Sequence, residues 1–525
     1  MTGGRQVTGE RQVTGGRQVT GGRQVTGGRR VAGRSAVPRT IPEQRLFIGG
    51  EWVEPDLGHY EVIDPATEEV VGLAPEAGRD QVHEAAAAAR DAFEAWSRTA
   101  PEQRAAVLDR AADVIQREFD AYAELARGET GATTGTARGM QVAVGLSRFR
   151  RYARGALEPV EQGLPPQVNE AGPMGRAGVL GALAARRPVG VVTCITSYNN
   201  PWANAAGKVA PALAMGNTVV VKPAPQDPLS VYRMAEALAE AGAPPGVVNV
   251  VSGSRAEAGE AAVDSPDVDM VSFTGSTAVG QRIGEVCGRS MKRQLLELGG
   301  KGAALVFDDA DLDSAVLGIG TTFAFYSGQI CTAPTRVLAQ RGVYERLVER
   351  LGAFAGRLKV GDPAERDTVV GPVISAAHRD RVESYIELGR KEGARLVVGG
   401  ERPDPARGYY VAPTLLADCG NGMRVVREEI FGPVVVVVPF GDEEEGVALA
   451  NDSDYGLIDY VWSGDVARAF RVAGRLRAGG VGVNTVGRNM EAPFGGFKKS
   501  GVGRDVGSYA LHAYSELQAI VWPGG

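Results

Sequence analysis

Short apolar runs alternate with longer amphipathic segments through the middle of the chain. Four runs have the length and composition of buried strands: residues 189–195, 218–222, 247–251 and 270–273. Between them, residues 202–215 and 231–241 have the pattern of helices. Strands that alternate with helices in this way predict a parallel sheet covered by helices. Such a sheet binds its ligands beyond the carboxyl ends of its strands.

The pattern changes at several points along the chain. Residues 1–30 contain four copies of a polar, Gly-rich hexapeptide, which cannot bury a core, so we expect residues 1–45 to be a disordered tail. Residues 79–127 are Ala-rich with apolar positions at helical spacing and predict amphipathic helices. Residues 158–187 are rich in Gly and Pro, which is typical of a connecting arm. A second α/β unit begins near Gly300.

Composition and charge exclude several classes of protein. The chain has 57 basic and 63 acidic residues, and this net charge of −6 predicts no nucleic acid and no anionic membrane as a partner. The longest apolar run, Val434–Val438, is far shorter than the roughly 18 residues of a membrane span. The N-terminus lacks the apolar core of a signal peptide, so we expect a cytoplasmic protein, either an enzyme or a scaffold. The four cysteines and four histidines are scattered, which predicts no disulfide framework and no metal site.

Three residues outside these patterns are candidates for chemistry. Cys331 follows Gly328 in a polar turn, where a thiol with a lowered pKa would be a nucleophile; a lone cysteine is more often a small buried hydrophobe. Glu297 lies between leucines and a Gly-Gly pair, as either a buried general base with a raised pKa or a salt-bridged boundary residue. Asn199 follows a strand and precedes a helix, where its amide either donates to an oxyanion or forms a turn.

A fourth candidate is the Gly-containing turn at residues 275–280. It follows a predicted strand and opens a predicted helix, so its backbone suits a pyrophosphate. As a dinucleotide fingerprint it is imperfect, because Ser276 and Thr277 occupy the middle of the GxGxxG pattern.

Taken together, these segments resemble the aldehyde dehydrogenase superfamily, from about residue 46 to the C-terminus. Seven motifs carry the resemblance, in order: Pro188–Val191 with Asn199 and Pro201, Lys222–Ala224, Gly275–Gly280, Glu297–Lys301, Gly328–Cys331, Glu429–Val434 and Pro493–Arg504. The resemblance implies an α/β fold with a Rossmann-like cofactor domain at 46–157 and 188–299 and a catalytic α/β domain at 300–505. It further implies a small β arm for oligomerisation at 158–187 and 506–525, and hence a homodimer or homotetramer.

The resemblance also implies roles for individual residues. Cys331 would attack the aldehyde, Asn199 would stabilise the oxyanion, Glu297 would activate water for hydrolysis of the thioester, and Lys208 would have a lesser catalytic role. The cofactor, NAD or NADP, would bind to the following residues: Ile195, Lys222, Gly275, Ser276, Gly280, Glu429 and Phe431. Many NAD-preferring members carry an acid where this chain has Pro225, so NADP is not excluded, and NAD is favoured slightly on family grounds.

The substrate is a small aldehyde whose class the sequence leaves open. By family position the pocket would draw on Tyr198, Tyr326, Ile330, Thr332 and the segment Val486–Ala492, which contains Arg488, and most of these residues suit an uncharged aliphatic or aromatic aldehyde. Arg488 would instead bind the carboxylate of a semialdehyde, or point to solvent as loop arginines commonly do. Two other functions remain as alternatives: a CoA-acylating enzyme, which the presence of Glu297 disfavours, and a catalytically silent binding protein on the same fold.

Overall fold

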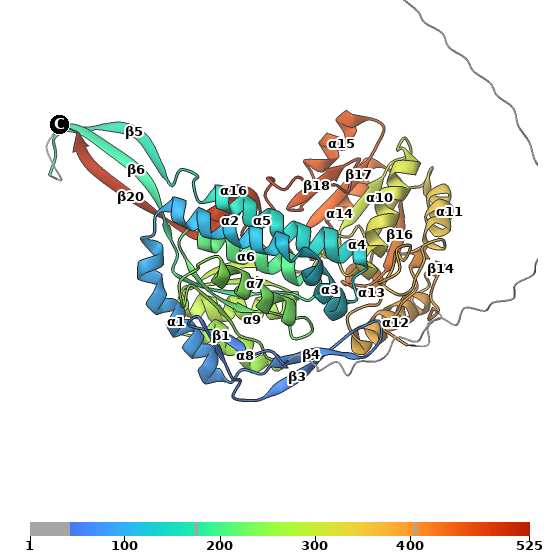
Figure 1. Cartoon of the computed structure of the whole chain (residues 1–525). Helices are drawn as coiled ribbons and strands as arrows, with labels where there is room; N and C mark the ends of the chain where they lie inside the picture. The colour runs from blue at the N-terminus through green and yellow to red at the C-terminus, as the bar shows by residue number, and fades with distance from the viewer. Residues whose placement is uncertain (1–42, 174–176, 404–406, 525) are drawn as a thin grey trace, which may run out of the picture. The chain divides into compact units, whose positions relative to one another are not determined.

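The computed structural model describes residues 43–173, 177–403 and 407–524, and two sheets dominate it (Figure 1). The predicted disordered tail lies outside the described residues except for its last three positions. There Glu43 forms a bridge with Leu73 and the backbone N–H of Gln44 donates to the carbonyl of Leu73, so the predicted boundary of the tail is a few residues too late.

The first sheet has eight strands, and its centre is parallel. Its strands are, in spatial order, β19 (Gly501–Val502), β11 (Arg293–Glu297), β10 (Met270–Thr274), β7 (Val191–Ile195), β8 (Thr218–Lys222), β9 (Val248–Val250), β1 (Leu46–Ile48) and β2 (Glu51–Val53). The pairs among β7 to β11 are parallel, whereas β1, β2 and β19 add antiparallel edges. The parallel sheet predicted from the alternating pattern is therefore confirmed.

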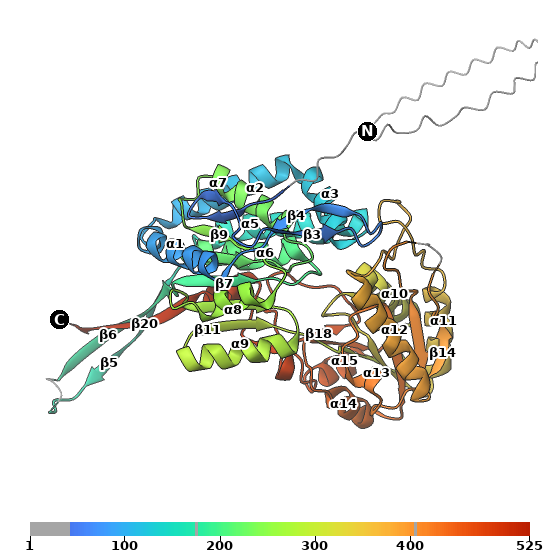
Figure 2. The ribbon, with the colours of Figure 1, turned by 90° about the horizontal axis from the view of Figure 1, so that it is seen from below.

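Helices cover both faces of this sheet (Figure 2). One apolar core joins the sheet to α2 (Pro101–Arg117), α3 (Phe119–Thr130), α5 (Val144–Gly155), α6 (Pro201–Ala214) and α7 (Leu229–Glu240). The other core joins it to α1 (Arg79–Ser97), α8 (Ala256–Asp264) and α9 (Thr277–Ser290). Because both faces are buried, the central strands are continuous apolar runs rather than alternating ones.

The second sheet has seven strands and the same layered construction. Its order is β14 (Arg395–Val398), β15 (Thr414–Ala417), β16 (Val434–Phe440), β13 (Arg336–Gln340), β12 (Ala303–Val306), β17 (Ile458–Trp462) and β18 (Gly480–Val483). The five-valine run lies in β16, buried between two parallel neighbours. Flanking helices include α10 (Leu312–Ala324), α11 (Tyr344–Ala355), α12 (Ala376–Lys391), α13 (Arg424–Arg427), α14 (Glu443–Asn451) and α15 (Val466–Ala473).

One C-terminal segment crosses from the second sheet to the first. β19 lies inside the range 300–505 that the sequence assigns to the catalytic domain, yet it pairs antiparallel with β11 through Leu296 and Glu297. The loop before β19 and the short α16 (Gly507–Ala513) therefore lie against the first sheet. This crossing brings residues 494–505 to the carboxyl end of β11, beside Glu297.

Three long strands form a separate sheet that projects from the rest (Figures 1 and 2). These are β20 (Ser515–Gly524), β6 (Gly178–Pro188) and β5 (Glu161–Asn169), so the segment 158–187 contains two paired strands rather than irregular chain. Several apolar side chains of this arm are exposed, including Val168, Leu517 and Trp522. A smaller sheet pairs β3 (His59–Ile63) with β4 (Val70–Pro75).

Among the described residues, no helix combines the length and the apolar character needed to cross a membrane. The cytoplasmic location expected from the sequence stays a prediction.

Candidate active site

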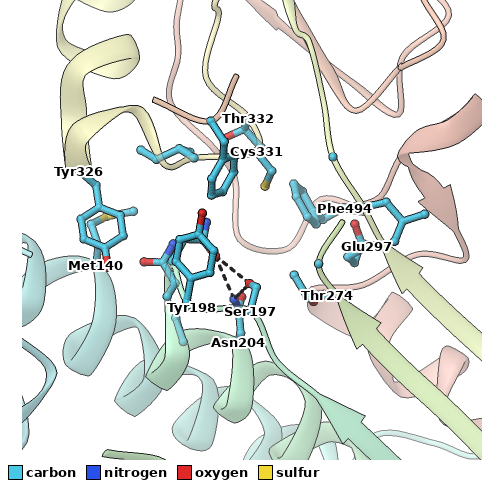
Figure 3. Close-up of a pocket in the computed structure, with 18 of the residues that line it drawn as sticks. Met140, Ser197, Tyr198, Asn204, Thr274, Glu297, Tyr326, Cys331, Thr332 and Phe494 are labelled. Carbon is cyan, nitrogen blue, oxygen red and sulfur yellow. Dashed lines mark hydrogen bonds between the residues drawn. The ribbon is translucent and has the colours of Figure 1, made fainter. Parts of the chain in front are cut away.

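A pocket of about 800 Å³ opens at the carboxyl ends of the parallel strands of the first sheet. Thr274 and Glu297, the last residues of β10 and β11, line it from that sheet, and the loop after β7 adds Ser197 to Asn200. Residues next to the second sheet close the opposite wall, among them Cys331 and Phe494 (Figure 3). The pocket thus lies where a parallel α/β sheet is expected to bind its ligand.

Most of the predicted site residues line this pocket. They are Cys331, Glu297, Asn199, Lys208, Gly275, Ser276, Glu429, Phe431, Tyr198, Tyr326, Ile330, Thr332 and Arg488. Three predicted cofactor residues do not line it. Ile195 is buried at the end of β7, Lys222 lies at the end of β8, and Gly280 packs inside α9 against Leu298.

A strained turn presents Cys331. The three residues Tyr326, Ser327 and Gly328 have φ values of 49°, 57° and 71°, in the left-handed region that only glycine occupies without cost. A Cβ on Gly328 would lie 2.1 Å from the carbonyl oxygen of Gly432, so no larger residue fits there. The Ser327 hydroxyl donates to the carbonyl of Gly371 at 2.7 Å and holds the turn in place. The turn that positions this thiol is therefore strained in its backbone.

The electrostatic environment of Cys331 differs from the sequence-based expectation. Burial raises the pKa of the thiol to about 12, and the charge of Arg488 is the largest influence in the opposite direction. The lowered pKa that the sequence interpretation set as a condition for a nucleophile is therefore not present in the protein without its ligands, because burial outweighs the single cation. The raised pKa favours the protonated thiol, which must lose its proton as it reacts.

Glu297 is a buried carboxyl group that faces the pocket. Its residue is 4% exposed, and neither carboxylate oxygen has a hydrogen-bond partner within the described part of the chain. Burial raises its pKa well above the ordinary value, and the nearby Asp505 adds to the effect. Gly495 packs beside the Glu297 carboxyl group, and a Cβ at position 495 would lie only 2.9 Å from Glu297 Oε1, so a glycine is needed to leave space for it. Of the two sequence interpretations, the structure favours the buried acid over the salt-bridged boundary residue.

Asn199 connects the first sheet to the segment that carries the thiol. Its amide Nδ2 donates to the carbonyl of Gln329 at 2.9 Å, and its Oδ1 accepts the Ser197 hydroxyl at 2.8 Å. Asn204 Nδ2 in turn donates to Ser197 Oγ at 2.8 Å (Figure 3). Because an amide nitrogen has two hydrogens, one remains for a ligand in the pocket.

Lys208 lies beneath the same region, in α6. Its Nζ donates to Ser272 Oγ at 3.1 Å, and that hydroxyl also bonds the Tyr514 hydroxyl at 2.8 Å. Burial lowers the pKa of the ammonium group, while Asp505 opposes this shift. Lys208 therefore connects the sheet, the C-terminal segment and the acidic pair Glu297 and Asp505.

Glu429 also lines the pocket, and backbone groups hold its carboxyl group in place. Its Oε1 accepts the N–H of Gly300 at 2.9 Å, and a Cβ on Gly299 would lie 2.2 Å from its Oε2. Burial raises the pKa of Glu429 to about 7. The carboxyl group is therefore enclosed by a Gly-Gly turn, with one oxygen left for a hydroxyl donor.

An aromatic group adjoins Glu429. Phe431 has a φ of 62°, and its carbonyl accepts His378 Nε2 at 2.7 Å. Tyr198 packs edge-on against both rings, with centroids 5.9 Å from Phe431 and 6.0 Å from His378. The sequence analysis missed His378, because a single histidine at the start of α12 carries no motif of its own. Together with the glycine turn at 275, these groups fit the ribose and nicotinamide of a dinucleotide.

Val486 and Met490 line the pocket from the segment 486–492, which the resemblance placed there. Sequence reasoning did not find four further lining residues: Met140, Val144, Arg148 and Phe325. Met140 lies on a π-helical turn at Ala137–Ala143, a rare geometry that often marks functional sites. No periodicity in the sequence distinguishes these residues from ordinary helix surface.

These features define an α/β enzyme whose pocket combines a cysteine thiol, a buried carboxyl group and a dinucleotide cradle. Residues 52–520 match the family model described as the aldehyde dehydrogenase family, and the chain belongs to that family. It is an enzyme that oxidises aldehydes with NAD or NADP as the acceptor.

Relatives support this assignment over nearly the whole chain. Geranial dehydrogenase of Castellaniella defragrans is 42% identical, over 92% of this chain and 99% of that protein. Betaine aldehyde dehydrogenase of Bacillus subtilis is 38% identical, over 91% and 97%. The solved NAD+ complex of an aldehyde dehydrogenase from Bacillus cereus is 38% identical, with a TM-score of 0.87 over 92% of this chain and 96% of that one.

Proposed function

We propose that the chain oxidises an aldehyde to a carboxylic acid by covalent catalysis at Cys331, followed by hydrolysis that uses Glu297. The observation that carries this proposal is the unpartnered, buried carboxyl group of Glu297 in the same pocket as the Cys331 thiol. A carboxyl group kept away from every protein donor is available to a water molecule, which is what hydrolysis of a thioester requires.

The first step forms a bond between Cys331 Sγ and the carbonyl carbon. Because burial raises the pKa of the thiol, its proton must leave to water in the pocket, and from there to solvent, as the bond forms. The negative charge that develops on the carbonyl oxygen is stabilised by the free N–H of Asn199 Nδ2 and by the backbone N–H of Cys331. The strained turn at 326–328 holds the thiol in place for this attack.

NAD(P), when bound, supplies the hydride acceptor that converts the thiohemiacetal into a thioester. Glu429 would hold a ribose hydroxyl, Phe431 and Tyr198 would flank the ring system, and the turn at Gly275 would accept the pyrophosphate. Lys222, whose Nζ donates to the carbonyl of Gly253 at 3.1 Å, lies where the adenosine ribose would bind.

In the last step, Glu297 takes a proton from water as the water attacks the thioester carbon. The carbon–sulfur bond then breaks, the acid leaves, and Sγ is protonated again. An acylating enzyme would pass the thioester to CoA and would have no use for such a base, so Glu297 favours hydrolysis.

The projecting arm supports a further part of the proposal, that the chain assembles as a homodimer or homotetramer. β5 and β20 are the two edges of the arm sheet, and the side chains along β5 are exposed throughout. Unpaired edges and apolar side chains of this kind are usually covered by a partner. Light scattering of the full chain would measure the number of copies.

The test is reduced-nicotinamide formation by the purified chain with aliphatic, aromatic and semialdehyde substrates, each with NAD and with NADP, and without CoA or phosphate. We expect turnover, and we expect Cys331→Ser to lower it by about 10³-fold or more while cofactor binding is kept. A Cys331→Ser variant with full turnover would contradict the assignment of the nucleophile. Turnover that appears only when CoA is added would identify an acylating enzyme instead.

A further inference from the structure

We infer that Arg148 and Arg488 together bind a carboxylate on the substrate, so that the enzyme acts on aldehydes that carry an anionic group away from the reacting carbonyl. The inference rests on the proposed function, because it concerns the substrate of the same pocket. It names two specificity-determining residues, one that the sequence analysis missed and one whose orientation it left open.

The first observation is where Arg488 lies. Its side chain is accessible, yet it lines the pocket instead of extending into bulk solvent. Its guanidinium stacks on the ring of Phe494, with 4.1 Å between Cζ and the ring centroid. Phe494 faces the space between Cys331 and Glu297 in Figure 3. Of the two orientations left open by the sequence, the structure therefore shows the one that faces the substrate.

The second observation is that a second guanidinium shares this pocket. Arg148, on α5, donates from Nη1 to the carbonyl of Ala203, and its remaining N–H groups are available. Room for it comes from Gly207 in the middle of α6, where a Cβ would lie 2.1 Å from Arg148 Nη1. A glycine inside a helix is unfavourable, so its presence here needs a reason, and the space for this arginine supplies one.

The third observation is that the two cations lack anions. Within the described part of the chain, neither Arg148 nor Arg488 has a carboxylate oxygen within 4.0 Å of its guanidinium nitrogens. The nearest acid on the same loop, Glu491, is bound by Arg151 at 2.6 Å and cannot serve Arg488. The charge of Arg148 also lowers the pKa of Arg488, after burial, so the two groups are close enough to repel.

One carboxyl group of the pocket, Glu297, is close enough to raise the pKa of Arg488, but it forms no ion pair with Arg488 among the described residues. Glu429 is held by the backbone N–H of Gly300. Several other residues that line the same pocket are apolar: Met140, Val144, Phe325, Ile330, Val486 and Met490. Two like charges held together in apolar surroundings favour a bound anion, and guanidinium groups match the planar carboxylate. This arrangement favours the semialdehyde alternative over the uncharged aldehyde that the sequence suggested.

The test compares two substrates of equal length, glutaric semialdehyde and pentanal, on three forms of the full-length enzyme. The forms are the wild type, Arg488→Gln, and Arg289→Gln as a matched control that removes one exposed arginine from the last turn of α9. We expect the wild type to prefer glutaric semialdehyde. Arg488→Gln should raise the KM of glutaric semialdehyde by about ten- to a hundredfold more than it changes the KM of pentanal, as expected for loss of a hydrogen-bonded ion pair. The control should behave as the wild type.

A binding measurement separates this inference from the catalytic proposal. Calorimetry on Cys331→Ala, which cannot turn over, should show glutarate binding that is weakened in Cys331→Ala/Arg488→Gln and in Cys331→Ala/Arg148→Gln. Equal KM values for the two substrates in the wild type, or an Arg488→Gln variant that affects both alike, would overturn the carboxylate site and leave aldehyde oxidation intact. Absence of oxidation of every aldehyde, despite glutarate binding, would overturn the proposed function and keep the anion site.

Discussion

Glu297 and Glu429 line the same pocket, and the two carboxyl groups have different surroundings. Glu429 is held by the N–H of Gly300 and enclosed by the Gly-Gly turn, whereas both oxygens of Glu297 lack a partner among the described residues. Burial raises the pKa of both, to about 7 for Glu429 and well above the ordinary value for Glu297. The charged neighbours also differ: Lys301 and Arg381 are the charges that act on Glu429, whereas the acid Asp505 is the largest charged influence on Glu297, ahead of nearby cations.

The difference separates a group that binds from a group that reacts. A carboxyl group that must hold a hydroxyl benefits from a fixed position and from nearby cations that favour its charged form. A general base must instead exchange protons near the working pH, and burial next to another acid raises its pKa in that direction. An unpartnered buried carboxyl group destabilises the fold, so its retention at Glu297 points to a use in the reaction.

The largest expected effect is at Glu297. Glu297→Gln keeps the size and burial of the side chain and removes the base, so we expect the first turnover to survive as a burst of reduced nicotinamide. Steady-state turnover should fall by about 10²- to 10⁴-fold, because hydrolysis of the thioester then lacks its base. Rapid-mixing absorbance measures the burst and the steady state in one trace. An unchanged steady-state rate would remove Glu297 from hydrolysis.

The same residue predicts a pH dependence. A raised pKa means that Glu297 is protonated, and inactive as a base, below that pKa, so turnover should rise with pH until the carboxyl group has ionised. The raised pKa of Cys331 acts in the same direction. In Glu297→Gln, the rise of the steady-state rate with pH that is due to Glu297 should disappear. A plot of rate against pH identical to that of the wild type would contradict the assignment.

A smaller effect is expected at Glu429. Glu429→Gln leaves the thiol and the base in place but removes a charged acceptor, so the KM for the cofactor should rise by about ten- to a hundredfold, with the burst retained. In the wild type, cofactor affinity should weaken as the pH falls below about 7, because the carboxyl group then becomes neutral. Fluorescence titration at pH 6 and pH 8 measures this. If Glu429→Gln shows the same pH dependence, another group is responsible.

The strands of the first sheet could be predicted from the sequence, because buried parallel strands are short continuous apolar runs, which loops do not contain. The runs at 218–222 and 270–273 correspond to β8 and β10, and the five-valine run to part of β16. Pairing across long distances left no such pattern. β19 is two residues long and joins the first sheet from the C-terminal part of the chain. Neither Gly501 nor Val502 carries a sequence feature that predicts this pairing.

The site shows the same division between local and distant signals. Cys331, Glu297 and Asn199 stand in motifs that a reader of the sequence can find, and all three line one pocket. Arg148 and His378 reach that pocket from helices whose sequence is ordinary. The sequence does not indicate how strongly burial raises the pKa of Cys331, because this depends on how many apolar atoms surround the sulfur, and these come from segments distant in sequence.

The smallest expected effect lies at the adenosine end of the cofactor cradle, where Pro225 stands in place of an acid. Lys222 lies three residues earlier in the chain, and burial lowers its pKa to about 8. Because position 225 is a proline, it has no carboxylate that would repel the 2′-phosphate of NADP. Pro225→Glu adds that charge at a partly exposed position, so kcat/KM with NADP should fall by about fivefold while the value with NAD is kept. Pro225→Gln is the matched control, since it removes the same ring without adding charge. An equal loss with both cofactors, or the same loss in Pro225→Gln, would mean that the proline ring and not the missing charge sets cofactor choice at this end of the pocket.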